Sequence, residues 1–265
     1  MKEKSGSIRR KLLPAGTFLL IILIWEMLAL SGVIPGYMLP SPLDVGRAFV
    51  RDFPNLMQHA LVSVEEAVYG LIIGTVLAFG LACAMDRFLH LEEAVFPLLV
   101  VTQTIPTIAV APLLVLWMGF GMAPKITLVV VTTFFPIAVG LLDGFKSVDP
   151  DAIMLMRSMN ATRSQIFRHV KFPAALPYFF SGLRISASYA VVGAVISEWL
   201  GGFEGLGVYM TRVRKAYAFD RMFAVIILVS VVSLLLMAAV NLIRRASMPW
   251  LQPLKNTGKG EYRSL

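Results

Sequence analysis

The stretch DGFKSVDPDAIMLMRSMNATRSQIFRHVKFPAALP, residues 143–177, is a basic, water-compatible segment between strongly apolar runs. Its capping residues predict two short helices. Asp149 is a suitable N-cap, and Pro150 stands at the first helical position, where its missing N–H costs nothing. Thr162 followed by Gln165 matches a capping box that starts the second helix.

Between these two helices, Asn160 tolerates the left-handed conformation that ends a helix. Each helix has one apolar face at helical spacing. The faces consist of Ile153, Met156 and Met159 in the first helix and of Ile166, Phe167 and Val170 in the second. Pro173 is expected to end the segment. Such a pair predicts a docking surface for a partner, with packing on the protein's own spans or on the lipid interface as the alternative.

Composition places this segment in a membrane protein. The chain has 265 residues, of which 57% are hydrophobic and 15% charged, with a mean hydropathy of +0.76, whereas soluble domains carry about 25% charged residues. Apolar runs long enough to cross a bilayer recur along it. We predict an all-α integral membrane protein with six spans at about 14–31, 63–85, 91–118, 125–142, 174–199 and 222–243. They form one domain over 14–245, with a basic tail at 1–13, the loop at 143–173 and a second tail at 246–265.

Prolines, polar residues and small residues occur within these spans. Pro97, Pro106 and Pro112 break the third span, and Gln103 and Thr104 lie between them. This pattern predicts either a broken helix that borders a transport pathway or an inert kink. Small residues at four-residue steps, such as Gly70 and Gly74 or Gly182 and Ser186, indicate close helix packing.

A second group of polar residues lies near the ends of spans. Glu26 in the first span is expected to face protein or a water-filled cavity rather than lipid. Glu198 at the end of the fifth span is a candidate pathway residue at the far membrane boundary. Regions 32–60 and 200–221 are expected to be connectors.

Other function classes find little support in the residues. The net charge of +8 is typical of Lys and Arg in cytoplasmic loops, and no basic cluster is interleaved with exposed aromatics as nucleic-acid binding would require. We expect no cofactor, no metal and no catalytic residues, since the histidines lack ligand spacing and no P-loop or nucleophile motif occurs. An ion-coupled secondary transporter remains the alternative, although no internal repeat is evident.

Charge distribution predicts the orientation. With the N-terminus in the cytoplasm, sixteen of the 24 Lys and Arg residues fall on the cytoplasmic side and seven on the other. This bias favours an N-in, C-in topology, although the basic connector at 212–221 weakens it. The segment at 143–173 would then be cytoplasmic.

These features together resemble the permease subunits of binding-protein-dependent ABC importers. Their loop signature is Glu-Ala-Ala, three residues, Gly, nine residues, Ile-x-Leu-Pro. In this chain Val170, Phe172 and Pro173 match its end, whereas Asn160 stands at the Gly position and residues 154–156 are Met-Leu-Met. Further segments are similar to the nitrate/sulfonate/taurine branch, among them MLPSP at 38–42, TIPTIAVAPLLVLWMGFGMAPKI at 104–126, GLRIS at 182–186 and GLGVYM at 205–210. The stretch at 186–202 is similar to permeases for thiamine-pyrimidine precursors.

The resemblance implies a type I importer in the bacterial cytoplasmic membrane. Two permease copies, expected to be identical, would form the pathway, a separate ABC ATPase dimer would supply energy, and an extracytoplasmic substrate-binding protein would deliver a small polar solute. No nucleic acid is expected as a partner. The ATPase-coupling candidates are Met154, Met156, Arg157, Met159, Asn160, Arg163, Ile166, Phe167 and Pro173, and the docking chemistry is expected to be more apolar than in the family pattern.

Overall fold

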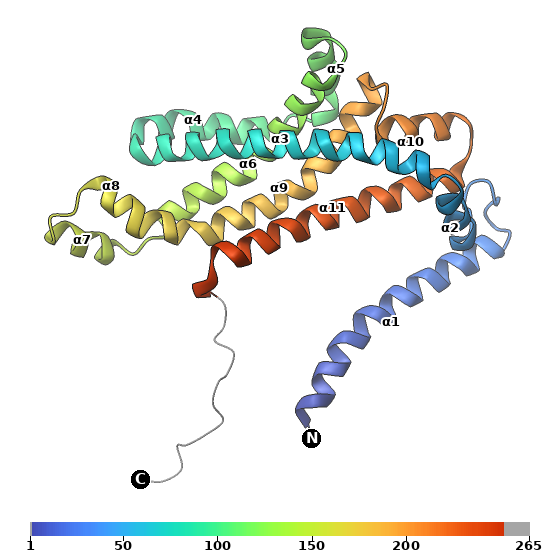
Figure 1. Ribbon diagram of the computed structural model, residues 1–265, viewed down its shortest axis with the longest axis horizontal. Coiled ribbons are helices and arrows are strands. Elements are labelled where there is room, and N and C mark those ends of the chain that lie inside the picture. Colours follow the sequence, from blue (N-terminus) through green and yellow to red (C-terminus); the bar gives the residue numbers. More distant parts are fainter. Residues whose placement is uncertain (1, 252–265) are drawn as a thin grey trace. The chain divides into compact units, whose positions relative to one another are not determined.

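Every regular element in residues 2–251, the part that the computed structural model describes, is a helix (Figure 1). Side chains are described for residues 13–250. The helices are α1 (Lys2–Leu30), α2 (Pro42–Arg51), α3 (Phe53–Arg87), α4 (Leu89–Thr102), α5 (Thr107–Met118), α6 (Met122–Lys146), α7 (Pro150–Ser158), α8 (Arg163–Ile166), α9 (Phe172–Gly201), α10 (Leu206–Lys215) and α11 (Phe219–Ser247). A π-helical turn, η1 (Phe167–Lys171), lies between α8 and α9, and a 3₁₀ turn, η2 (Pro249–Leu251), follows α11.

Five stretches are long and apolar enough to span a membrane: Leu13–Leu30, Phe53–Arg87, Met122–Lys146, Arg163–Gly201 and Phe219–Ser247. The bent pair of helices α4 and α5 makes a sixth span if the two helices are counted as one. The six-span prediction is therefore confirmed in this form. The broken third span is confirmed too, because the helix stops at Thr102 and restarts at Thr107, with Pro106 at the break.

Two predicted connectors turned out to contain helices. Region 32–60 contains α2 and the start of α3, and region 200–221 contains α10. The helices α2 and α10 are short and carry polar residues, so a prediction based on long apolar runs does not find them. The start of α2 is well specified: the Ser41 hydroxyl accepts from the Asp44 N–H at 3.2 Å, and Pro42 occupies the first turn.

The chain divides into two compact units. The first consists of residues 1–70, 106–129 and 191–232, and its largest apolar cluster joins α3, α9, α10 and α11. Members of this cluster include Leu56, Val195, Leu206, Tyr209, Val225 and Leu228. A smaller cluster joins α5 to α6 through Ala111, Leu114 and Leu128. The packed core of this unit positions the polar network described below.

The second unit consists of residues 71–105, 130–190 and 233–265. Small residues bring its helices together, as their spacing predicted. A Cβ added at Gly182 of α9 would overlap the backbone of Pro136 in α6, and the Ser186 hydroxyl donates to the Thr133 carbonyl at 2.7 Å. A Cβ added at Gly74 of α3 would similarly lie against Thr133.

Candidate functional site

The loop between α6 and α9 has the predicted local structure (Figure 1). Asp149 caps α7 by accepting from the Asp151 N–H at 2.9 Å. Asn160 has φ 58°, the left-handed conformation for which the family signature uses glycine. Thr162 and Gln165 form a complete capping box at the start of α8. Three local signals therefore fix the two helix starts and the turn between them.

The expectation that Pro173 ends the segment was wrong. The helix runs without a break from Arg163 to Gly201, and Pro173 lies in the first turn of α9. Because Pro173 follows the π turn closely, its missing N–H falls next to an interruption of the regular α-helical hydrogen-bond pattern rather than at a helix end. The π turn η1 precedes it, with the Phe172 N–H donating to the Phe167 carbonyl. The loop is thus continuous with the fifth predicted span.

The second helix turns its apolar face inward. Ile166 is 6% exposed, and the ring of Phe167 lies 5.3 Å from that of Phe145 and 6.3 Å from that of Phe172. These contacts are within the protein: Ile166 is buried and Phe167 is half-buried, which fits the alternative of packing on the protein's own helices. A docking role for the two residues stays a prediction.

Exposed apolar side chains gather on α7 and the residue after it. Met154 is 58% exposed, Leu155 63% and Met159 71%, while Met156 is half-buried. Leu155 is the residue that the sequence reasoning did not select. Of the remaining candidates, Arg157, Asn160 and Arg163 are exposed and Pro173 is half-buried.

The candidate pathway residues Gln103 and Thr104 lie in the break between α4 and α5. Both are exposed. The Thr104 hydroxyl donates to the Val101 carbonyl at 2.8 Å, which satisfies one carbonyl at the end of α4, and the Gln103 amide nitrogen lies 3.4 Å from the Thr102 hydroxyl. The Gln103 side chain therefore makes only one weak contact among the described residues and is available to a ligand.

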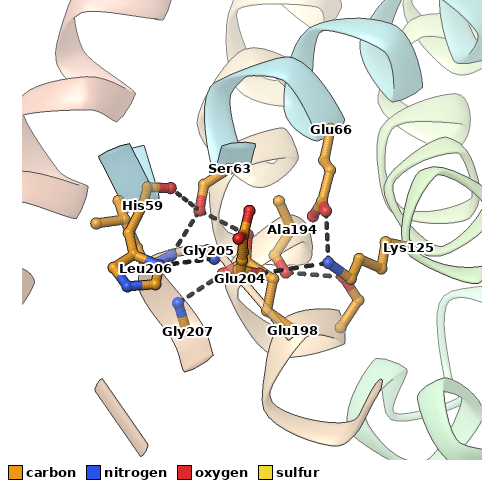
Figure 2. A network of polar contacts seen from close by, with 11 residues as sticks. His59, Ser63, Glu66, Lys125, Ala194, Glu198, Glu204, Gly205, Leu206 and Gly207 are labelled. Carbon is orange, nitrogen blue, oxygen red and sulfur yellow. Dashed lines mark hydrogen bonds and ion pairs between the residues drawn. The ribbon is translucent and has the colours of Figure 1, made fainter. Parts of the chain in front are cut away.

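Glu198 belongs to a buried polar network in the first unit (Figure 2). It is 1% exposed. Its carboxylate accepts from the Ser63 hydroxyl and from the Gly207 N–H, both at 2.5 Å. The Glu198 carboxylate thus holds the loop that follows α9, and a role for Glu198 in the pathway stays a prediction.

The network caps the N-terminus of α10 (Figure 2). Helix N-termini leave backbone N–H groups unpaired, and the N-cap Gly205 has no side chain that could accept from them. His59 Nδ1 accepts from the Gly205 N–H at 3.0 Å and the Ser63 hydroxyl accepts from the Leu206 N–H at 2.8 Å. The Glu198 carboxylate accepts from the N–H of the next residue, Gly207. Three consecutive N–H groups are therefore satisfied by side chains of α3 and α9.

Glycine is required at position 205 of this cap. Gly205 has φ +119°, which L side chains rarely adopt, and a Cβ there would overlap the Glu198 carboxylate. The sequence GGFEGLG at 201–207 thus permits the close approach of the chain to Glu198.

A buried ion pair completes the network. Lys125 Nζ of α6 lies 2.6 Å from Glu66 Oε1 of α3, with side chains that are 7% and 1% exposed. Lys125 Nζ also lies 3.5 Å from the Glu204 carbonyl oxygen. Sequence reasoning missed His59, Ser63, Glu66 and Lys125. The spacing of the first three, i, i+4 and i+7, places them on one face of α3 and was the available signal.

A polar cluster outside the spans holds α10 from its other side. The Tyr209 hydroxyl donates to Asp52 Oδ2 at 2.7 Å, and Arg221 Nε lies 3.2 Å from the same oxygen. Burial, followed by the negative charge of Asp52, raises the pKa of Tyr209 above its ordinary value. The hydroxyl therefore remains a donor at all physiological pH values.

Two substitutions distinguish a role of Glu198 as a hydrogen-bond acceptor in the cap of α10 from a role that requires its negative charge in the pathway. We expect Glu198→Gln to leave the free energy of unfolding within about 1 kcal/mol of the parent, because an amide oxygen still accepts from Gly207. Its nitrogen can donate to Ser63, whose hydroxyl then turns to the His59 carbonyl, 3.4 Å away. Glu198→Ala should cost about 1–3 kcal/mol, since a buried N–H loses its acceptor.

The measurement is unfolding of both variants in mixed micelles together with solute uptake. If Glu198→Gln abolished uptake without loss of stability, the negative charge itself would be required and the anchoring role would be insufficient.

The comparisons with known proteins agree with this architecture. Residues 70–248 match the family model described as "Binding-protein-dependent transport system inner membrane component". The chain belongs to this family. It is a multi-pass permease subunit of an ABC importer in the bacterial cytoplasmic membrane.

Two relatives are more than a third identical to the chain. It is 37% identical to the formylaminopyrimidine transport permease protein ThiX of Halalkalibacterium halodurans, over 89% of this chain and 95% of that protein. It is 36% identical to a probable ABC transporter permease protein of Haemophilus influenzae, over 83% and 90%. Relatives at 27% to 31% identity are permease proteins for riboflavin, aliphatic sulfonates and taurine.

A solved structure shows the same fold. The inward-facing MetNI methionine ABC transporter aligns with a TM-score of 0.64 at 21% identity, covering 72% of this chain and 95% of that one. The type I importer fold expected from the sequence is thereby confirmed, and nothing in the comparisons favours an ion-coupled secondary transporter.

Proposed function

We propose that this subunit couples to a separate ABC ATPase through the exposed apolar face of α7. The carrying observation is that Met154 and Leu155 of the capped helix α7, and Met159 directly after it, are all more than half exposed. Exposed clusters of large apolar side chains mark interaction sites, and a helix that presents them fits a groove on a partner. Met-Leu-Met in place of the acidic signature makes this contact mainly apolar.

The orientation of α7 follows from the charge distribution. The excess of Lys and Arg on the side of the N-terminus supports an N-in, C-in topology, which places α7 and α8 in the cytoplasm with the ATPase. A second, identical copy of this chain would complete the pathway, and the exposed Gln103 at the break between α4 and α5 is a candidate to line it. A substrate-binding protein would deliver the solute from outside.

For the solute, we propose a formylaminopyrimidine-like thiamine precursor. The support is the 37% identity to a permease of that name over nearly the whole chain. Taurine or an aliphatic sulfonate is the second candidate, on the basis of the more distant relatives. The proposal does not rest on Glu198, whose carboxylate accepts from Ser63 and Gly207.

Uptake by proteoliposomes tests this proposal. The permease is reconstituted with its ATPase and its binding protein, and labelled formylaminopyrimidine is supplied outside with ATP inside. We expect accumulation that requires ATP and is competed by the unlabelled pyrimidine but not by taurine. Accumulation that an ionophore abolishes while ATP is present would contradict ATP coupling. Competition by taurine alone would assign the sulfonate class.

A further inference from the structure

A basic cavity lies behind the α7–α8 loop, within the second unit. It has a volume of about 570 Å³ and opens between the C-terminal end of α3, α7 and the α8–η1 segment. Its charged lining consists of Asp86, Arg87, Arg157, Arg163 and Lys171. Small-molecule sites are commonly about 300–1,000 Å³, so the cavity is large enough for an organic ligand.

The charges around this cavity are not balanced. Lys171 Nζ lies 2.6 Å from Asp86 Oδ1, with side chains that are 25% and 16% exposed, so these two neutralise one another. Arg87, Arg157 and Arg163 have no acidic partner among residues 13–250. Three guanidinium groups from three separate elements therefore surround one opening without a counter-ion.

We propose that this cavity binds a phosphate-bearing anion. The planar guanidinium group offers donors in a fork that matches phosphate oxygens, and several such groups bind a phosphate more strongly than one. Ile153, Ile166 and Phe167 supply an apolar wall beside the arginines. The ligand thus carries a carbon skeleton next to its phosphate, as a phospholipid headgroup or a free organic phosphate does.

The cavity is distinct from the ATPase-docking face. Residues four apart share one side of a helix, so Ile153 and Arg157 face the cavity together. Leu155, between them, points to the opposite side of α7 because successive residues turn by about 100°. A partner seated on Leu155 and Met159 would contact the side of α7 that faces away from Ile153 and Arg157. The observations therefore favour a small anion over an acidic surface of the ATPase, and the inference does not depend on the transported solute.

The single cysteine of the chain reports on occupancy. Cys83 lines this cavity and is half-buried. The rate at which a neutral maleimide modifies Cys83 is measured with the permease in maltoside micelles without phospholipid, in the same micelles with glycerol phosphate added, and in the same micelles with phosphatidylglycerol added. A nearly saturated site should slow the reaction about tenfold. The arm that shows protection identifies the source of the phosphate.

The matched variants are Arg87→Gln/Arg157→Gln/Arg163→Gln and, as control, Arg184→Gln. Arg184 is an exposed arginine of the same unit that does not line the cavity. The triple variant should lose protection and the control should keep it. Single substitutions at Arg87 or Arg157, each expected to weaken protection, serve if the triple variant does not purify.

Two results would overturn the proposal. One is an unchanged rate of Cys83 modification in both phosphate-containing arms, and the other is equal protection in the parent and the variants that lack the arginines. Protection only after addition of the ATPase would also overturn it, in favour of an acidic protein surface.

Discussion

Replacing Lys125 by methionine is expected to lower the free energy of unfolding by about 3–5 kcal/mol. Glu66 is then left as a carboxylate that is 1% exposed without its partner 2.6 Å away. Its other oxygen, Oε2, already lacks a hydrogen-bond partner in the described structure. Methionine keeps the volume and apolar stem of lysine, so the loss reports on the charge rather than on a cavity.

A second substitution provides the control. The double variant Lys125→Met/Glu66→Leu should recover most of the stability, because replacing a whole buried ion pair with apolar groups is often close to neutral. Unfolding in mixed micelles, followed by tryptophan fluorescence, measures all three proteins. A single variant as stable as the parent would show that water or another group neutralises Glu66. A double variant no more stable than the single one would show that Lys125 acts through other contacts, such as that with the Glu204 carbonyl.

The sequence predicted what depends on short-range chemistry. The caps at Asp149 and at Thr162 with Gln165, and the left-handed Asn160, each rest on a side chain acting on backbone within three residues. These signals need no knowledge of the rest of the fold. They were correct in place and in type, as were the small-residue contacts between α6 and α9.

The sequence could not show which apolar face of the loop is covered. The faces of α7 and α8 are similar in composition, yet Ile166 is buried, and the neighbouring Phe167 packs on Phe145, more than twenty residues earlier in the chain. Leu155, on the other hand, stays exposed. Burial depends on packing against helices that are far apart in the chain, and helical periodicity alone does not predict which helix packs on a given face.

The polar network was missed for a related reason. Glu198 was selected because it stood out at the end of an apolar span, but its partners are 135 and nine residues away in Ser63 and Gly207. Lys125 and Glu66 are separated by 59 positions. Each of these charges alone resembles a boundary residue, and only the packing of α3, α6 and α9 within one unit joins them.

The contact with the ATPase is expected to fail when charges are placed on the exposed face of α7. In the variant Met154→Asp/Leu155→Asp, two aspartates would replace side chains that are 58% and 63% exposed in the free subunit and would be buried in the complex. Truncating a central interface residue costs about 2 kcal/mol or more, equivalent to roughly 30-fold in Kd for each. We therefore expect loss of ATPase co-purification and of ATP-driven uptake, with normal membrane insertion and an unchanged unfolding midpoint.

The same charge placed elsewhere in the loop separates docking from a general effect. His169 is exposed, lies on η1 rather than on α7, and does not line the basic cavity, so His169→Asp should retain ATPase binding. Ile166→Asp, by contrast, buries a charge and should lower stability instead of acting at the interface. If the ATPase co-purified with Met154→Asp/Leu155→Asp as well as with the wild type, the docking proposal for α7 would be contradicted. Equal losses in that variant and in His169→Asp would show that the ATPase responds to the charge of the loop rather than to the apolar contact at Leu155.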